Sequence, residues 1–145
     1  MLNTLSNIDK KTLLKQLKEQ FHFSGELDYN LFINQDKKIF IFNKGLQIDF
    51  SKIRVNSLGL YFANVENKIR LTIEGSQIIG PHSKKNILEI NENQLQDWIH
   101  GKDIETNEEL EGFILIKNNN DFYGTGKYKE GKIINFIPKE RRLKN

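Results

Sequence analysis

The chain has 145 residues, of which 37% are hydrophobic, and this is enough for one ordinary domain or two small ones. No apolar run approaches the roughly 18 residues of a membrane span. The N-terminus lacks the apolar segment of a secretory signal, so we expect a cytoplasmic protein that does not contact a membrane. The absence of cysteine excludes a disulfide scaffold, a thiolate zinc site and a cysteine nucleophile.

The net charge of +3 conceals a division of charge along the sequence. Residues 89–111 contain eight acidic residues and only one basic residue, whereas residues 112–145 contain eight basic and three acidic residues. Lys outnumbers Arg eighteen to four. Lys acts as a point charge on phosphate, while base reading favours the bidentate Arg fork. The pattern is typical of a protein that binds a polyanion through its backbone and shape.

The first half of the chain predicts one helix followed by strands. Residues 7–21 form an amphipathic pattern, in which Leu13, Leu17 and Phe21 recur at every fourth position and lysines take the wet side. Ser6 or Asn7 can cap this helix. The sequence then predicts two strands, at 28–33 and 38–43, which are joined by a turn at 34–37. Three more strands are expected at 53–55, 60–65 and 68–74.

Two of these strands carry further expectations. The run Ile39–Phe42 is apolar on both faces, which indicates a central strand. Phe40 and Phe42 exceed what a small core needs, so their face of the hairpin is a candidate protein-docking surface. Residues 68–74 alternate between apolar and polar side chains, as a half-buried strand does.

The second half predicts a strand, a helix and a β-meander, after a loop at Gly75-Ser76 and Gly80-Pro81. We place a domain boundary at this loop, which gives domains 1–75 and 76–145. The elements expected after it are a strand at 86–90, a helix from Asn91 to Gly101 with a capping box at Gln94, an acidic loop at 103–111, and strands at 113–117, 122–129 and 132–137 joined by a turn at 130–131. The whole pattern indicates an α+β protein.

Catalytic and metal-binding patterns are weak. None of the three histidines, His22, His82 and His100, has the spacing of a metal ligand relative to another His or a carboxylate. Gly124 and Gly126 resemble neither a phosphate-binding loop nor a dinucleotide fingerprint, and glycine within a strand more often marks a bulge. The acidic loop lacks the spacing of a calcium-binding loop. We therefore expect no cofactor, no metal and no catalytic residue.

The basic residues carry the stronger signal. Lys127 and Lys129 share one face of their predicted strand, and Tyr123 and Thr125 join them if no bulge intervenes. Pro138 fixes the direction of the chain as it leaves the sheet, so that the basic tail can stay near it. The candidate RNA-binding residues are Lys84, Lys85, Tyr123, Lys127, Lys129, Lys139, Arg141 and Arg142.

The second half resembles the PUA family of RNA-binding domains, through the ordered segments KKNILEINENQLQDWIHGKDI, EGFILIK, FYGTGKYKEGKI and IPKERR. It is most similar to the PUA-like C-terminal domain of Sun-family rRNA cytosine-C5 methyltransferases, and residues 58–83 fit the same relative. The chain also looks like free-standing archaeal proteins that carry an α/β pre-domain, a layout that occurs in Nip7-like ribosome biogenesis factors. The resemblance implies an N-terminal α/β pre-PUA domain followed by a C-terminal PUA-like β-barrel.

The resemblance further implies a non-enzymatic protein that binds rRNA or tRNA and acts in RNA modification or ribosome biogenesis. It places RNA against Gly101, Lys102 and the 122–129 strand, although the acidic loop after the helix would repel phosphate. One alternative is an accessory subunit that docks on a separate RNA methyltransferase or a preribosomal particle. Another is an enzyme, such as a nuclease, for which the sequence offers no acid–base pair.

Overall fold

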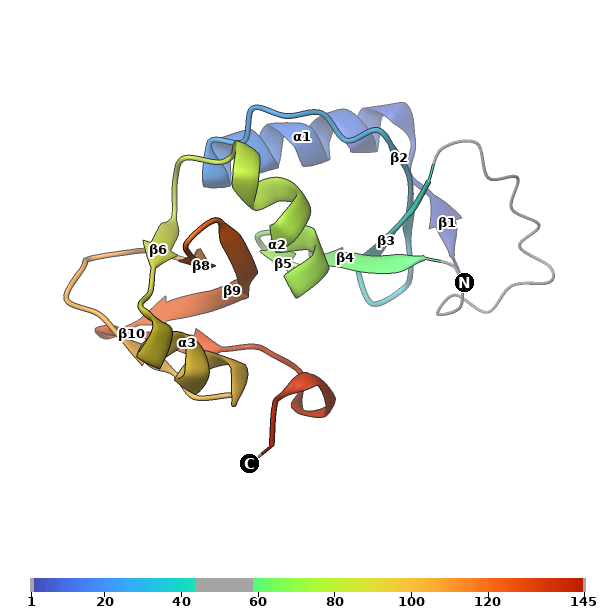
Figure 1. Cartoon of the computed structure of the whole chain (residues 1–145). Helices are drawn as coiled ribbons and strands as arrows, with labels where there is room; N and C mark the ends of the chain where they lie inside the picture. Colours follow the sequence, from blue (N-terminus) through green and yellow to red (C-terminus); the bar gives the residue numbers. More distant parts are fainter. Residues whose placement is uncertain (1, 44–58, 145) are drawn as a thin grey trace.

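The computed structural model describes residues 2–43 and 59–144, and in them two curled five-stranded sheets and three α-helices (Figure 1). The first sheet has the order β1-β2-β3-β4-β5 and consists of β1 (Asn3–Thr4), β2 (Tyr29–Ile33), β3 (Lys38–Asn43), β4 (Leu60–Asn64) and β5 (Arg70–Leu71). The second has the order β6-β8-β9-β10-β7 and consists of β6 (Ile87–Glu89), β7 (Ile104–Glu105), β8 (Phe113–Asn118), β9 (Asp121–Lys129) and β10 (Lys132–Asn135). The α+β class is confirmed.

The first sheet is antiparallel throughout, and β3 is its central strand, as the two-sided apolar run predicts. The expectation that Phe40 and Phe42 are exposed is wrong. Both side chains are buried. They pack with Phe32, Tyr61 and Leu2 in a mainly aromatic cluster on one face of the sheet. The strand expected at 53–55 lies outside the described residues.

Helix α1 (Asn7–Phe21) covers the other face of this sheet and has the predicted bounds. Ser6 caps it, because its Oγ accepts a hydrogen bond from the Asp9 N–H at 3.1 Å. The predicted stripe of Leu13, Leu17 and Phe21 is buried in the core. Nowhere in the described part of the chain is there a helix that is both long and apolar enough to cross a membrane.

The strand expected at 68–74 and the loop expected at Gly75-Ser76 are wrong. Only two residues of the strand pair in β5, and helix α2 (Ile73–Ile79) begins directly afterwards. Thr72 ends the strand because its Oγ accepts a hydrogen bond from the Gly75 N–H at 3.0 Å and so caps the helix. Position 75 has no room for a side chain, since a Cβ there would collide with the carbonyl oxygen of Phe62.

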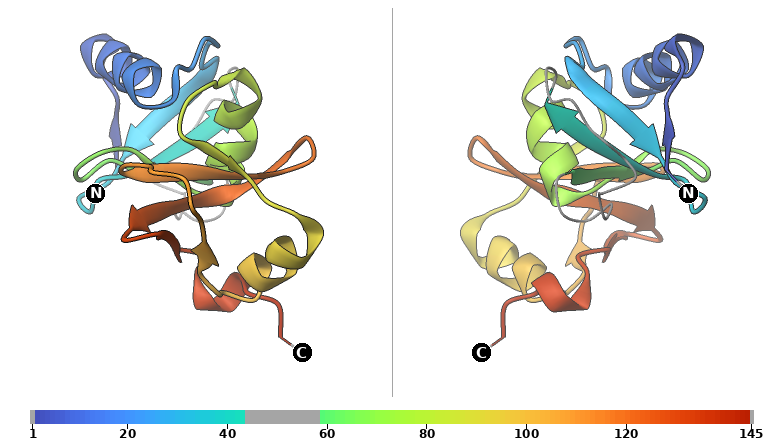
Figure 2. Two further views of the ribbon diagram at one scale, coloured as in Figure 1. Left: turned by 90° about the vertical axis from the view of Figure 1, so that its left-hand side faces the viewer. Right: turned by 90° about the vertical axis from the view of Figure 1, so that its right-hand side faces the viewer.

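Helix α2 lies between the two sheets, and Figures 1 and 2 show it packed against β4 and β9. The Gly124 N–H of β9 donates to the buried Ser76 Oγ at 2.8 Å, and Thr125 Oγ1 donates to the Leu71 oxygen at 2.9 Å. The main core likewise joins residues of the first sheet to Leu115 and Phe122 of the second. A boundary at 75/76 falls inside this helix, and the division into domains 1–75 and 76–145 stays a prediction.

The second half of the chain follows its prediction except at β7, which pairs with β10 inside the loop expected at 103–111. After the 3-10 turn η2 (Gly80–His82), β6 pairs in parallel with β8, and the meander β8-β9-β10 is antiparallel. Helix α3 (Glu92–Ile99) has the predicted capping box, in which the Asn91 and Gln94 side chains each accept from the other's backbone N–H. Its Trp98 is fully buried in a second core beneath the curled sheet.

Candidate nucleic-acid interface

The structure distributes the predicted RNA-binding residues over three places. Lys84 and Lys85 lie at the C-terminal end of α1, where both N–H groups donate to the Phe21 oxygen at 2.9 and 3.0 Å. Lys127 and Lys129 lie near the β9–β10 turn, and the basic C-terminal tail lies beside α3. Figures 1 and 2 show α1 and the tail at opposite ends of the molecule, so the structure does not gather the predicted set on one face.

A bulge in β9 separates Tyr123 from the lysines of the same strand. Three steps from Phe122 to Thr125 pair with only two steps of β8, and Gly124 takes a φ of +88°. Tyr123 is thereby placed against the second core, and its main-chain oxygen accepts a hydrogen bond from Trp98 Nε1 at 2.8 Å. Thr125 keeps the orientation of the lysines but is buried beneath β5. The sequence places Tyr123 and Thr125 beside Lys127 and Lys129 only if no bulge intervenes; the bulge is present, and neither residue joins the exposed lysines.

The surroundings of Tyr123 are also anionic. Its partial burial raises the pKa of the phenol, and the charges of Asp121 and Glu92 raise it further. Both carboxylates would repel a phosphate that approached this ring.

The β9–β10 turn gathers an exposed lysine hairpin, which consists of Lys127, Lys129 and Lys132. Lys132 pairs directly with Lys129 across the two strands. Glu130 and Gly131 form the predicted two-residue turn, with φ of 48° and 84°, which matches the positive φ values of a type I′ hairpin. The candidate list omitted Lys132, although the pairing of the two strands through this turn places it opposite Lys129.

The basic tail is held against the end of α3. After Pro138, residues Lys139–Arg141 form the 3-10 turn η3. Arg142 Nε donates to the Ile137 oxygen at 2.8 Å, and its side chain fills the space where a Cβ of Gly101 would stand. The Leu143 N–H donates to the Ile99 oxygen at 2.9 Å. These contacts bring the tail to the loop after α3, where the resemblance places RNA.

A buried amide that the candidate list omitted fixes this loop to the sheet. Asn135 Nδ2 donates to the oxygens of Trp98 at 2.7 Å and Lys102 at 2.9 Å. Its Oδ1 accepts from the Ile137 N–H at 2.8 Å, and its own N–H donates to Asp103 Oδ1 at 2.8 Å. Asn135 therefore sets the positions of both the loop after α3 and the start of the tail.

A cleft of about 530 Å³ opens between the first sheet, the β9 bulge and the tail. Two cations cover aromatic rings at its wall, with Arg70 5.1 Å from the ring centroid of Phe136 and Lys38 5.3 Å from that of Tyr61. The lining residues are Lys38, Tyr61, Arg70, Leu71, Thr72, Ile73, Glu74, Gly124, Thr125, Phe136, Ile137, Pro138, Glu140 and Arg141. Charge, aromatic surface and backbone polar groups therefore meet in one hollow.

Arg141 is already paired in this cleft, because its Nη1 lies 2.6 Å from Glu74 Oε1. Burial opposes the ionisation of Glu74, but the hydrogen bond from Arg141, a backbone hydrogen bond and the Arg141 charge together hold the pKa of the carboxyl below 4.5. The same hydrogen bond raises the pKa of Arg141. Of the predicted cations, Arg141 thus contributes the least uncompensated charge.

Metal binding has no support in residues 2–43 and 59–144, where no group of three or more His, Asp or Glu side chains could hold an ion.

Comparisons with known proteins match this chain to one family and to several relatives. The family model for the PUA domain of the methyltransferase RsmF matches residues 85–143. The ribosomal RNA small subunit methyltransferase F of Vibrio vulnificus (strains YJ016 and CMCP6) is 21% identical over 127 residues, which cover 87% of this chain and 27% of the relative. That of Vibrio atlanticus (strain LGP32) is 25% identical over 109 residues, which cover 73% of this chain and 23% of the relative.

The chain thus spans about a quarter of the length of the curated relatives that it matches. The matched segment contains β6, α3, the meander and the basic tail. The expected resemblance is confirmed: residues 85–143 match the PUA domain of the methyltransferase RsmF.

Proposed function

We propose that this chain is a non-enzymatic RNA-binding protein that acts in rRNA modification or ribosome biogenesis. The observation that carries the proposal is the match of residues 85–143 to the RsmF PUA domain, together with relatives that are named as methyltransferases of small-subunit ribosomal RNA. Residues 1–75 act as the pre-PUA part. A role on rRNA places the protein in the cytoplasm and makes an RNA methyltransferase or a ribosome assembly factor its expected neighbour.

Phosphate contacts come from the lysine hairpin and the tail. Lys127, Lys129 and Lys139 are exposed and form no ion pair with any residue that the structure describes. Cations of this kind release counterions from RNA when they bind, so affinity falls as salt rises. Arg142 supports the surface from the end of α3 through its contact with Gly101.

The cleft beside the tail supplies the features that an unpaired base requires. Phe136 is 36% exposed, and Arg70 lies over its ring. Stacking on an aromatic or guanidinium plane is sequence-tolerant and contributes roughly 1–3 kcal/mol per base. RNA recognition here therefore combines a phosphate grip at the lysine hairpin with stacking at the cleft.

The test compares a hairpin variant with a matched control. The hairpin variant carries Lys127→Gln, Lys129→Gln and Lys132→Gln, and the control carries Lys10→Gln, Lys37→Gln and Lys68→Gln, which remove the same charge elsewhere. Fluorescence anisotropy with a hairpin RNA of about 16 base pairs measures affinity across a salt series.

The hairpin variant should lower the slope of log affinity against log salt by roughly 2–3, because each lost phosphate contact contributes about 0.7–0.9. The control should keep the slope of the original protein. A hairpin variant that also keeps this slope would contradict the assignment of the phosphate grip. An original protein without salt-dependent RNA binding would contradict the proposed function itself.

A further inference from the structure

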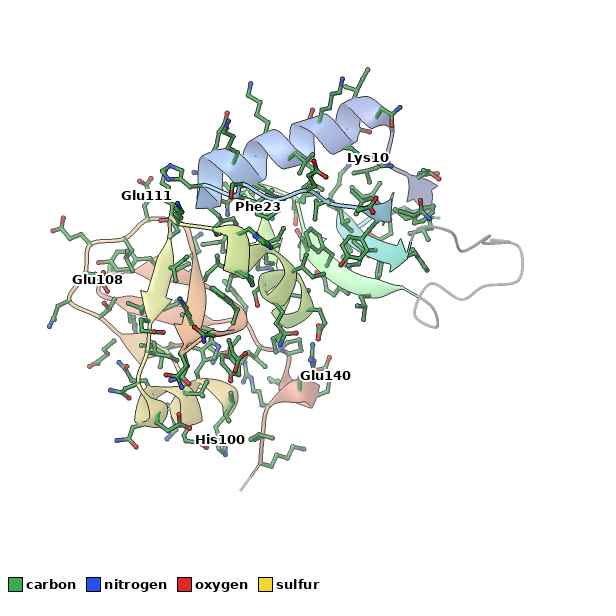
Figure 3. All side chains as sticks on the ribbon, turned by 45° about the horizontal axis from the view of Figure 1, so that its top comes forward. Lys10, Phe23, His100, Glu108, Glu111 and Glu140 are labelled. Atoms are coloured by element: carbon green, nitrogen blue, oxygen red, sulfur yellow. The ribbon has the colours of Figure 1, made fainter. Side chains whose placement is uncertain are left out.

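Helix α1 presents a second cationic surface that the PUA match does not include. Lys11, Lys15, Lys18 and the C-cap residue His22 follow one another at intervals of three or four positions. With 3.6 residues per turn, such positions form one stripe along a helix. All four residues are exposed, and we call this surface the α1 stripe. Figure 3 shows α1 with side chains projecting away from the body of the protein.

The two carboxylates of α1 do not lie on the stripe. Asp9 is in the first turn, where it favours the positive end of the helix dipole. Glu19 faces a separate hollow, which it shares with Glu109 and Glu111 of the acidic loop and with Lys85. Among the described residues, no carboxylate pairs with Lys11, Lys15 or Lys18. Glu19 lies four positions after Lys15, but within the described residues no ion pair holds the three lysines of the stripe, so they remain available to an anion.

A segment far away in sequence lengthens the stripe at the C-terminal end of α1. The Lys84 N–H donates to the Phe21 oxygen at 2.9 Å, and the Ser24 N–H donates to the His82 oxygen at 2.9 Å. The rings of Phe23 and His82 meet edge to face, with centroids 6.4 Å apart. Lys84 is thereby fixed next to the last turn of α1. Lys84, one of the predicted RNA-binding lysines, therefore adjoins the α1 stripe.

The spacing along the stripe makes its charges act together. At about 1.5 Å per residue, successive members are separated by roughly 4.5–6 Å along the helix axis, and the stripe is about 16 Å long from Lys11 to His22. The spacing between successive members is shorter than the Debye length of about 8 Å at physiological salt. A chain of phosphates that lies along the stripe therefore interacts with more than one cation at a time.

We propose that the α1 stripe is a second binding surface for the RNA backbone, which grips phosphates at the end of the molecule opposite the basic tail. This inference rests on the proposed function and extends it to the N-terminal half. The occupant is a nucleic acid and not a membrane, because the apolar face of α1 (Leu13, Leu17 and Phe21) is buried in the core and cannot enter a lipid surface.

The two surfaces give the protein a bivalent grip. RNA that reaches from the stripe to the lysine hairpin binds its second site at high effective concentration, whereas RNA too short to reach both gains nothing from the second surface. The stripe uses point charges without a base-reading Arg, so it adds affinity and orientation without sequence preference.

The closing experiment removes the stripe alone. The stripe variant carries Lys11→Gln, Lys15→Gln and Lys18→Gln, which are compatible with a helix because Gln and Lys have similar helix propensity. It is compared with the original protein, the hairpin variant and the control variant in the same salt series with the RNA of about 16 base pairs. Urea unfolding followed by the fluorescence of Trp98 verifies that the four proteins are equally folded.

The stripe variant should lower the log–log slope by roughly 2–3, as three lost phosphate contacts require, while the control variant retains the original slope. A stripe variant with the original slope, beside a hairpin variant with a reduced one, would overturn the stripe and leave the proposed function standing. If no protein, not even the original, binds RNA in a salt-dependent way, both the stripe and the proposed function are overturned. A stripe that binds an acidic peptide but leaves the RNA slope unchanged would likewise overturn this proposal.

Discussion

Replacement of Asn135 by Asp should destabilise the protein in a manner that depends on pH. The amide nitrogen of Asn135 donates to two main-chain oxygens, those of Trp98 and Lys102, and its residue is only 8% exposed. A carboxylate oxygen in its place donates nothing, faces both oxygens and adds a charge close to Asp103. The Trp98 oxygen keeps the hydrogen bond from the Gly101 N–H at 3.0 Å, but the Lys102 oxygen loses its side-chain donor and the new charge is buried. An unsatisfied buried group costs about 1–3 kcal/mol and a charged one more, so the expected loss at pH 7 is roughly 2–5 kcal/mol.

The pH dependence follows from the same geometry. The surrounding oxygens favour the protonated form of the new carboxyl, so its pKa in the folded protein rises above the unfolded value of about 3.9. The loss of stability is complete above the folded pKa and becomes smaller as pH falls through it, because the protonated group can again donate one hydrogen bond.

Urea unfolding measures this prediction directly. Trp98, the only tryptophan, is fully buried in the second core and contacts the same network, so its fluorescence reports unfolding. With a slope of about 2 kcal/mol per molar urea, the midpoint at pH 7 should fall by roughly 1–2.5 M. Asn107→Asp is the matched control in the exposed acidic loop. A midpoint shift as small as that of the control, or one that is equal at pH 7 and at pH near 4, would refute the reasoning.

Two further predictions concern the contacts between the halves of the chain. Arg141→Gln should lower the free energy of unfolding by about 0.2–1 kcal/mol at pH 7, since the pair with Glu74 is partly exposed and solvent screens it. Because the pKa of Glu74 is lowered in the folded protein, this difference should vanish as pH falls through that pKa below 4.5, as thermal unfolding at several pH values can show. Ser76→Ala leaves the buried Gly124 N–H without an acceptor and should cost about 1–3 kcal/mol, against about 0.5–1.5 kcal/mol for Ser83→Ala, whose hydroxyl bonds only to a helix carbonyl. Equal losses in urea unfolding would contradict this role of Ser76.

The elements that the sequence predicts correctly depend on local signals. Helix α1 follows from its repeat of apolar residues and its Ser6 cap, and α3 follows from a capping box within four residues. The β9–β10 hairpin follows from two positions, Glu130 and Gly131, that adopt positive φ. In each case the residues that decide the conformation are neighbours in the chain.

The elements that the sequence misses depend on partners far away in the chain. Residues 68–74 alternate as a strand does, yet the helix begins at Ile73, where Thr72 caps it and Gly75 lies close against the Phe62 oxygen of the first sheet. Gly124 indicates a bulge in its strand, but the Ser76 hydroxyl that fixes this bulge lies 48 residues earlier. No pattern within a single strand predicts such a contact.

The candidate interface likewise depends partly on signals in the sequence and partly on contacts between distant residues. Composition and charge indicate a polyanion-binding protein, and the resemblance to PUA domains names the family that residues 85–143 match. Which cations gather is decided by tertiary structure, which attaches Lys84 to the end of α1 and pairs Arg141 with Glu74. The aromatic wall of the cleft at Phe136 depends equally on Arg70, a residue of the other sheet.

The position of α2 between the sheets has a practical consequence for protein engineering. A fragment that begins at residue 85, where the family match starts, leaves behind the hydroxyl that supports the β9 bulge and uncovers Leu115 and Phe122. Such a fragment should express poorly or aggregate, since exposed apolar surface of this kind promotes association. Anyone who grafts this PUA domain onto another scaffold should therefore transfer β4, β5 and α2 along with it.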